Sequence, residues 1–491
     1  MPPLRIAFVT AEVAPFAKTG GLADVSAALP AHLVRHGHDV RVIMPLYDVL
    51  DAKRFDFVPV DYLHHVPVRL GDAVFHFSAF TARLPDTEVD VYFIGCPTLY
   101  DRGAIYTGAR DDHLRFAFLA KAALVCCQHM GFSPDILHAN DWHAALAPLY
   151  AKTVFGWDRE RFGTTRSVLT IHNLAYQGRF PADTVPNLGL HGHAHELHQD
   201  HLRDGWMSFL ETGILHADAI TTVSGTYARQ IQTPAYGEGL DGLLRQRSSS
   251  VVGIVNGIDE TVWNPETDPD IPWNYGPETV AEGKAECKRH LLEELGLPYD
   301  PKAPVLGIVS RLTVQKGFEI THEPLVHALR HRDLRVTVLG SGERELEEHF
   351  SWLQRTFPDK VCFYRGYHEE LAHWIEAGAD IFLMPSRFEP CGLNQMYSLK
   401  YGTVPIVHKT GGLADTVRLF DPATGEGTGF VFDHFDTSGF AWALKAALDA
   451  YDDPETWSTI QQNGMAEDFS WTRQGAIYEQ LYERLLRLPR S

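Results

Sequence analysis

The sequence predicts an α/β protein with two doubly wound parallel sheets, each covered by helices on both faces. Short apolar runs alternate with longer mixed segments from one end of the chain to the other. Most of these runs are continuously apolar, which is typical of strands buried on both faces. A proline-rich break near the middle leaves enough strands on either side for a separate sheet. Such strand–helix alternation favours parallel sheets between layers of helices.

The candidate strands are the short apolar runs. Before the break they are Arg5–Thr10, Val40–Pro45, Val89–Gly95, Asp135–His138, Val168–Ile171, Ala219–Val223 and Val251–Val255. After it they are Val305–Ser310, Arg335–Leu339, Val361–Tyr364, Asp380–Met384 and Val404–Val407. Helical stretches lie between them, for example Leu22–His36, His113–Met130 and Phe440–Tyr451.

The break falls between Asn264 and Pro304 and is rich in prolines and acids, a composition typical of a linker. Within it, Glu278–Leu297 is predicted to be helical. We place the boundary near residue 265, which predicts domains of residues 1–264 and 265–491. Aromatic and leucine residues recur at helical spacing in Phe469–Leu488, which predicts a packed last helix that is able to return to the N-terminal domain.

Composition excludes several classes of protein. A net charge of -20 over 491 residues makes the chain a poor general binder of nucleic acid, whose affinity rests on phosphate neutralisation. The start, MPPLRIAFVTAEVAPF, lacks the apolar core of a signal peptide. No apolar run approaches the length of about 18 residues that a membrane span needs. We therefore expect a cytoplasmic protein with no membrane partner.

The cysteines carry neither a disulfide framework nor a zinc site, because none forms a CxxC pair. They are Cys96, Cys126, Cys127, Cys287, Cys362 and Cys391. We expect reduced thiols, as in most cytoplasmic proteins.

One heptapeptide occurs twice: KTGGLAD stands at Lys18–Asp24 and again at Lys409–Asp415. Each copy follows a candidate strand and precedes a candidate helix. We interpret the copies as two half-sites for one ligand. The expected contacts are Lys18, Gly20, Gly21 and Asp24 in the first copy, and Thr410, Gly411 and Gly412 in the second. The competing interpretation is two strand-to-helix turns that share the conformational freedom of glycine.

Three cations lie beside turns after candidate strands, where open α/β sheets bind ligands. They are Lys18, Arg311 and Lys316, and glycines near the two lysines allow a ligand to approach the backbone. Arginine grips two phosphate oxygens and lysine acts as a point charge, so the set suits a diphosphate leaving group without a metal. For each cation alone, the competing interpretation is a solvated surface charge.

Polar residues after other strands suit a sugar. Glu389 stands in a Pro-Cys-Gly loop and is placed to bind hydroxyls and stabilise positive charge on a sugar ring. The competing interpretation is a helix-terminus or ion-paired acid. His172 and Asn173 are candidate donors to sugar hydroxyls, with a satisfied buried histidine as the alternative. Asp141 is a candidate polar orienter or helix N-cap.

Other motifs are weak or missing. Gly340-Ser-Gly342 lacks the third glycine of a dinucleotide fingerprint, because Glu345 stands in its place. Asp268-Pro-Asp270 has the letters of a metal-binding DxD but lies in the linker. No Walker A motif and no GxSxG elbow occurs. These motifs are too weak to indicate a dinucleotide-binding fingerprint or a metal-binding DxD site.

Several motifs closely resemble those of bacterial glycogen synthases and plant starch synthases. The matching segments run in order over nearly the whole chain: KTGGLADV at Lys18–Val25, HANDWH at His138–His143, VNGID at Val255–Asp259, SRLTVQKG at Ser310–Gly317, PSRFEPCGL at Pro385–Leu393 and KTGGLAD at Lys409–Asp415. Together they are highly specific, whereas any one alone is not.

The resemblance implies a GT-B fold, with two Rossmann-like domains facing across a cleft that holds the active site. It implies ADP-glucose as the donor substrate and the non-reducing end of an α-1,4-glucan, in glycogen biosynthesis, as acceptor. It also implies retention of anomeric configuration, no cofactor and no essential metal. Oligomeric state is left open.

Residue roles follow from the same resemblance. Lys18, Arg311 and Lys316 would hold the diphosphate, Glu389 would contact glucose and support the transition state, and His172 would bind glucose with its backbone carbonyl towards the anomeric carbon. The matching motifs also place near the substrates Asp141, Asn173, Asn256, Cys391, Gly392 and Leu393, and they place Tyr367 against adenine.

One position departs from the wider group of retaining GT-B enzymes, many of which carry a second glutamate eight residues after the first. Here that position is Tyr397. No motif carboxylate is placed as a nucleophile on the opposite sugar face, so we favour a front-face mechanism.

The alternative functions are a related enzyme that makes a small disaccharide or maltose phosphate, an inactive glucan-binding or nucleotide-sugar-binding protein, a dehydrogenase, and a phosphorylase.

Overall fold

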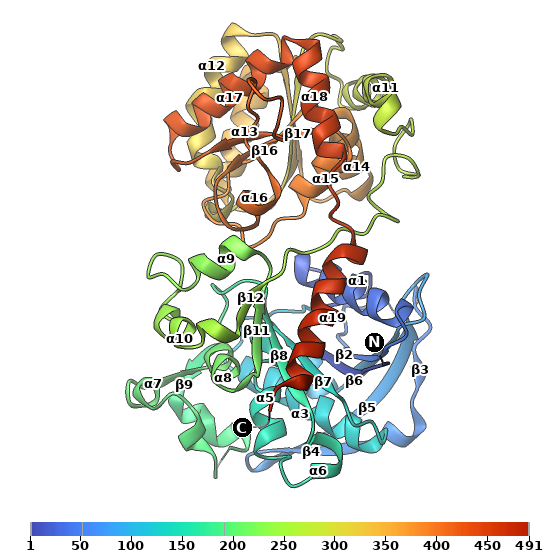
Figure 1. The fold of residues 1–491 in the computed structure, drawn as a ribbon, viewed down its shortest axis with the longest axis vertical. Helices are drawn as coiled ribbons and strands as arrows, with labels where there is room; N and C mark the ends of the chain where they lie inside the picture. Colours follow the sequence, from blue (N-terminus) through green and yellow to red (C-terminus); the bar gives the residue numbers. More distant parts are fainter. Residues whose placement is uncertain (1, 52, 191, 490–491) are drawn as a thin grey trace. The chain divides into compact units, whose positions relative to one another are not determined.

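The computed structural model describes residues 2–51, 53–190 and 192–489, and these form two compact units (Figure 1). The first unit contains the residues up to Val223, then Ala228–Gly257, and the chain from Trp471 onwards. The second contains Ser224–Tyr227 and Ile258–Ser470. The main division therefore follows Gly257, a little before the expected boundary at 265. The last helix belongs to the first unit.

The first unit is built on a twisted sheet in the order β12-β11-β8-β7-β1-β2-β6-β5-β3, with β4 paired to β5. From β12 to β6 the strands are parallel. The strands are β1 Arg5–Val9, β2 Asp39–Pro45, β3 Val58–Pro59, β4 Val66–Leu70, β5 Ala73–Arg83, β6 Asp90–Gly95, β7 Ile136–Asn140, β8 Arg166–Ile171, β11 Ala219–Thr222 and β12 Val251–Gly253. A separate antiparallel pair joins β9 Arg179–Pro181 to β10 Trp206–Ser208.

Helices cover this sheet. They are α1 Gly21–Arg35, α2 Pro97–Tyr100, α3 Asp112–His129, α4 Asp141–Ala144, α5 Ala147–Lys152, α6 Arg159–Phe162, α7 Gln199–Arg203, α8 Phe209–His216, α10 Asp241–Gln246 and α19 Trp471–Arg487. Helix α9 is Gly225–Gln230. Its residues up to Tyr227 are assigned to the second unit, and those from Ala228 to the first.

The antiparallel edge of this sheet was not predicted. Strand β5 pairs with β6, β4 and β3 in antiparallel register, and its side chains are only partly buried. A strand with partly exposed side chains lacks the continuous apolar run that marked the buried strands. The search for continuous apolar runs therefore did not detect β5.

The second unit is a smaller parallel sheet in the order β15-β14-β13-β16-β17-β18. Its strands are β13 Val305–Val309, β14 Arg335–Gly340, β15 Val361–Arg365, β16 Ile381–Met384, β17 Val404–His408 and β18 Phe430–Phe432. Its helices are α11 Val280–Glu294, α12 His322–His331, α13 Arg344–Thr356, α14 Glu369–Gly378, α15 Asn394–Lys400, α16 Gly411–Thr416, α17 Thr437–Tyr451 and α18 Pro454–Met465. The predicted pair of Rossmann-like α/β domains is confirmed.

Each sheet has a point where the strand order reverses. In the first unit β1 lies between β2 and β7, and in the second β13 lies between β14 and β16. The two loops that leave neighbouring strands at such a point diverge to opposite faces and open a crevice, where α/β proteins bind ligands. The segments after β1, β7, β13 and β16 are therefore the candidate ligand-binding loops.

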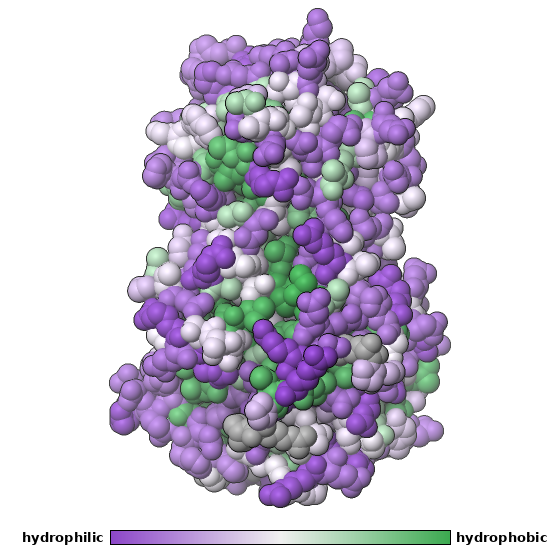
Figure 2. All heavy atoms as spheres, viewed as in Figure 1, coloured by the Kyte–Doolittle hydropathy of each residue, from purple (hydrophilic) through white to green (hydrophobic). Residues whose placement is uncertain are grey.

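No helix among the described residues is long and apolar enough to cross a bilayer. The face drawn in Figure 2 is mostly hydrophilic. In the described part of the chain, the cysteines are free thiols.

Candidate active site

In the second unit the loops after β13 and β16 are joined to each other. The backbone N–H of Arg387 donates to the carbonyl of Gln315 at 2.9 Å. The amide of Asn394 donates to the carbonyl of Val309, the last residue of β13, at 3.0 Å. Gly317 has φ 72°, and a Cβ there would lie 2.2 Å from the carbonyl oxygen of Pro385. Only glycine lets these loops approach so closely.

The charged centre of this junction is an ion pair between two predicted site residues. Lys316 Nζ lies 2.6 Å from Glu389 Oε2, and Ser386 Oγ donates to the same oxygen at 2.9 Å. The Glu389 side chain is 8% exposed and that of Lys316 is 19% exposed. The ion-paired interpretation of Glu389 is therefore correct. It is compatible with a catalytic role, because a buried charge-assisted pair holds both groups in fixed positions.

The second copy of the repeated heptapeptide packs directly on the Glu389 loop. The N–H of Gly412 donates to the carbonyls of Glu389 and Pro390 at 3.0 and 3.1 Å. A Cβ on Gly411 would lie 1.9 Å from the carbonyl oxygen of Glu389, and one on Gly412 would lie 2.2 Å from that of Cys391. These glycines, at the start of α16, therefore allow the backbone of the loop that carries Glu389 to pack directly against the helix.

Gln395 locks the other side of this loop. Its amide nitrogen donates to the carbonyls of Cys391 and Gly392 and to the Thr416 hydroxyl, at 3.1, 3.0 and 3.0 Å. Thr410 and Cys391 are buried, and Leu393 stands just before α15. The predicted residues of the two loops thus form one assembly.

Two other predicted contacts on this unit are open to solvent. Arg311 is exposed, and no hydrogen bond or ion pair engages its guanidinium within the described chain. Tyr367 is 72% exposed, in the turn after β15. The discounted Gly340–Gly342 turn packs on the Arg311 segment, because a Cβ on Gly340 would lie 2.1 Å from the carbonyl oxygen of Ser310. The turn therefore supports the loop that carries Arg311.

In the first unit, a buried acid organises the loop after β1. Glu12 is 2% exposed and accepts hydrogen bonds from the backbone and hydroxyl of Thr19 and from the hydroxyl of Tyr106. Burial raises the pKa of Glu12, although the hydrogen bonds oppose the shift. Lys18 Nζ pairs with Asp24 Oδ1 at 2.8 Å. A Cβ on Gly20 would meet nothing within 4 Å, so this copy of the heptapeptide presents an open backbone.

The loop after β7 orients the loop after β8. Asp141 has φ 52° and accepts from the backbone N–H groups of His172 and Asn173, at 2.7 and 3.4 Å. Burial raises the pKa of Asp141 to about 7. Asp141 is therefore the polar orienter; the alternative of an N-cap is wrong, because the cap residue of α4 is Asn140.

His172 is buried, and Nε2 lies 3.1 Å from Asn140 Oδ1. Burial lowers the pKa of His172 to about 3, so the ring is neutral at physiological pH. A neutral ring held by the Asn140 oxygen carries its proton on Nε2. This leaves Nδ1 as an acceptor, while Asn173 Oδ1 accepts from the backbone N–H of Ala175.

Asn256 is the remaining predicted residue of this unit. It is 4% exposed, and Oδ1 has no hydrogen-bond partner within the described chain. It precedes Gly257, on which a Cβ would lie 2.8 Å from the Trp471 ring.

A pocket of about 340 Å³ lies just beyond these loops. It is lined by Trp142, Ala175, Tyr176, Gln177, Gly178, Arg179 and Glu238. Aromatic faces beside amide, guanidinium and carboxylate groups are suited to a polar ring compound such as a sugar.

Sequence reasoning missed the residues that hold the site together, above all Glu12, Asn140, Ser386 and Gln395. Two of them could have been noticed from the sequence. Glu12 is an acid just after an apolar strand, and Ser386 lies three residues before Glu389. Their partners lie elsewhere in the chain, so the signal showed neither contact.

Comparison with known proteins agrees with this geometry. A family model described as "Starch synthase catalytic domain" matches residues 5–246, and one described as "Glycosyl transferases group 1" matches residues 296–464. The glycogen synthase of Streptococcus gordonii is 43% identical over 98% of this chain and 100% of its own. That of Myxococcus xanthus is 45% identical over 98% and 100%.

A solved structure agrees as well. The catalytic domain of starch synthase IV from Arabidopsis thaliana, bound to ADP and acarbose, has a TM-score of 0.90 and 33% identity. The match covers 99% of this chain and 100% of that one. This chain therefore belongs to the glycogen synthase and starch synthase family, and it is a GT-B glycosyltransferase that transfers glucosyl units.

Proposed function

We propose that the protein is a cytoplasmic glycogen synthase that transfers glucose from ADP-glucose to the non-reducing end of an α-1,4-glucan, with retention of configuration and without a metal in the transfer step. The observation that carries the proposal is the Lys316–Glu389 ion pair at the reversal point of the second sheet. It sets a fixed cation and a fixed carboxylate side by side, as a departing phosphate and a developing sugar cation require.

We assign the binding of the donor's diphosphate to cationic side chains. Arg311 is exposed and unengaged, so it is available to grip phosphate oxygens. Lys316 and Lys18 supply further positive charge, and the open backbone around Gly20 leads into the N-terminus of α1, which favours anions. The ADP bound by the Arabidopsis relative supports this assignment.

The glucosyl group is assigned to Glu389 and His172, with the His172 carbonyl towards the anomeric carbon. Tyr367 offers an exposed ring for adenine to stack on. The pocket beside Trp142 and Tyr176 is assigned to the acceptor glucan. The acarbose bound by the Arabidopsis relative is consistent with a glucan-like ligand.

We favour a front-face reaction. The bond from the anomeric carbon to the leaving phosphate oxygen breaks, and the acceptor hydroxyl oxygen bonds to that carbon on the same face. The departing phosphate takes the hydroxyl proton. Tyr397 does not replace the missing second glutamate as an acid, because its ring is buried in a stack on Trp263, with centroids 4.1 Å apart. Trapping a glucosyl adduct on a carboxylate would contradict this mechanism.

The direct test is to incubate the purified protein with glycogen and EDTA, with ADP-glucose or UDP-glucose in separate reactions, and to measure nucleotide release and chain extension. We expect extension from ADP-glucose that survives EDTA and falls steeply in Lys18→Ala. A folded protein that neither releases nucleotide nor extends chains would overturn the proposal. Products of only two sugar units would instead indicate a disaccharide-forming relative.

A further inference from the structure

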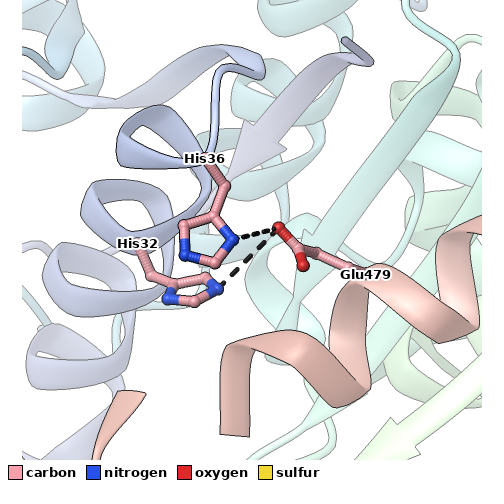
Figure 3. Close-up of side chains that lie close together, drawn as sticks. All are labelled: His32, His36 and Glu479. Atoms are coloured by element: carbon pink, nitrogen blue, oxygen red, sulfur yellow. Dashed lines mark ion pairs between the residues drawn. The ribbon is translucent and has the colours of Figure 1, made fainter. Parts of the chain in front are cut away.

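Helix α1 carries a second cluster of polar side chains at the end opposite to Lys18–Asp24. His32 and His36 lie one turn apart near its C-terminus and point towards Glu479 of α19 (Figure 3). Glu479 Oε1 lies 3.8 Å from His32 Nε2 and 2.9 Å from His36 Nδ1. The glucosyl-transfer site uses none of these residues.

The packing of α19 on α1 is built around this cluster. A Cβ on Gly475 would lie 2.4 Å from His32 Nε2, so only glycine lets α19 pass over the imidazole at this point. Glu479 follows one turn later, above His36. The His32 side chain is 1% exposed, and Nε2 has no hydrogen-bond partner in the described chain. A buried ring nitrogen without a partner is costly, which indicates that a ligand of the cluster completes it.

A third histidine shows how the carboxylate is held. His38 Nδ1 accepts the backbone N–H of Leu4 at 3.0 Å, so its neutral ring carries the proton on Nε2. That Nε2 lies 3.2 Å from Glu479 Oε1 and donates to it. His38 therefore orients the carboxylate from behind, as the outer partners of metal ligands do.

We propose that His32 Nε2, His36 Nδ1 and the Glu479 carboxylate bind a divalent cation of the zinc type, which ties the last helix of the chain to the first. Two histidines and one carboxylate, with water as fourth ligand, form a common zinc set. Ligands around a tetrahedral zinc are about 3.4 Å apart, which lies between the two observed donor separations. His36 is 42% exposed, so water reaches the site.

Electrostatics favours a cation here. The C-terminal end of a helix carries partial negative charge, and both histidines lie in the last turn or cap of α1. His32 Nε2, which has no hydrogen-bond partner in the described chain, lies at this end of the helix.

Two other clusters of this kind occur among the described residues, and several of their ligand atoms are engaged in internal contacts. His198 Nδ1 caps the backbone of His201, whose own ring contacts Glu211 at 2.8 Å. Asp268 Oδ2 receives hydrogen bonds from His373 and Tyr401. In the second of these clusters His373 Nε2 has no hydrogen-bond partner in the described chain, so it is the Asp268 carboxylate, and not the histidine, that is engaged.

The bound cation would restrain α1 along its length. A helix of 15 residues is about 22 Å long, and its other end presents the Lys18 loop. The cation is therefore a structural tie and takes no part in glucosyl transfer.

The test is a titration of the EDTA-treated, dialysed protein with Co²⁺, whose four-coordinate complexes absorb visible light far more strongly than the hydrated ion. We expect an intense spectrum in the wild type that is lost in H36A and E479Q. H38A should weaken Co²⁺ binding by roughly 10- to 100-fold, as loss of an outer partner does. H331A is the matched control, because His327 and His331 form an exposed pair one turn apart on α12.

Thermal unfolding supplies a second readout. Zn²⁺ should raise the Tm of the wild type and of H331A, but not that of H36A. If wild type and H36A differ in Tm equally with and without Zn²⁺, the cluster is an ion pair only and the proposal is overturned. It is also overturned if the wild type shows no Co²⁺ spectrum, or if H36A and E479Q retain it. Glycogen extension in EDTA tests the transferase separately, so either proposal can fail alone.

Discussion

Lys316 Nζ and Glu389 Oε2 lie 2.6 Å apart, although 73 positions separate the two residues in the chain. The contact exists because the loops after β13 and β16 meet where the strand order of the second sheet reverses. In the proposed reaction Lys316 contacts the departing phosphate and Glu389 contacts the sugar. A double-mutant cycle can therefore measure how far the effect of one group on the rate depends on the other.

Glu389→Gln should lower kcat by about 100-fold or more, since loss of one preorganised charged group from a dry site has an effect of that order. Lys316→Ala should do likewise. In a double-mutant cycle the two losses should not add, because each substitution already disrupts the same pair. Steady-state rates of ADP release measure this.

The control for that cycle is Glu319→Gln, which breaks the nearby exposed pair with Arg387. Exposed ion pairs contribute little, so its kcat should remain within about twofold of the wild type. Full additivity of the Lys316 and Glu389 effects would show that the two groups act independently.

Arg311→Ala should lower kcat/KM for ADP-glucose by roughly 10- to 100-fold, the effect of losing a hydrogen-bonded charged contact to phosphate. The Tm should not change, because the guanidinium has no partner in the described chain. Arg311→Lys should recover only part of the loss, since lysine lacks the fork. Arg344→Ala, at another exposed arginine, is the control. A large drop in Tm for Arg311→Ala would count against a ligand-binding role.

The two copies of KTGGLAD should respond differently to the same change. Gly412→Ala places a Cβ 2.2 Å from the carbonyl oxygen of Cys391, so we expect Tm to fall by roughly 2 to 10 °C. Gly20→Ala meets nothing within 4 Å and should leave Tm nearly unchanged, while it raises KM for the donor. Differential scanning calorimetry and donor titrations distinguish these effects. Equal Tm changes in both variants would contradict the packing difference.

Asp141 predicts a specific dependence of stability on pH. Its pKa is raised by burial from 3.8 to about 7, so the folded protein favours the protonated acid. Asp141 therefore costs no stability below about pH 4, and its cost grows as pH rises to 7. Asp141→Asn removes this cost while keeping an oxygen for the backbone N–H of His172.

The measurement is the difference in Tm between Asp141→Asn and the wild type at several pH values. The variant should gain stability relative to the wild type between pH 5 and pH 8. A difference that stays constant over this range would show that Asp141 does not titrate there.

Much of the fold was predictable because its signals are local. The buried strands from Arg5–Val9 to Val404–His408 follow from continuous apolar runs, and α1 follows from the glycines before it and the apolar spacing within it. The site residues stay a prediction, but their common position after strand ends is also a local signal. These features depend on a few neighbouring residues, so the linear chain contains them.

Tertiary structure alone decided which of these residues meet. The sequence by itself determined the strands, the glycine turns and the polar residues after them, and through its motifs the family. It did not show that Glu12 anchors Thr19 and Tyr106, or that the second glycine pair supports the Glu389 loop while Gly20 of the first pair stays open. Nor did it show that Glu479 lies over His32 and His36. These contacts join distant parts of the chain, so they depend on strand order and helix packing, which no local pattern encodes.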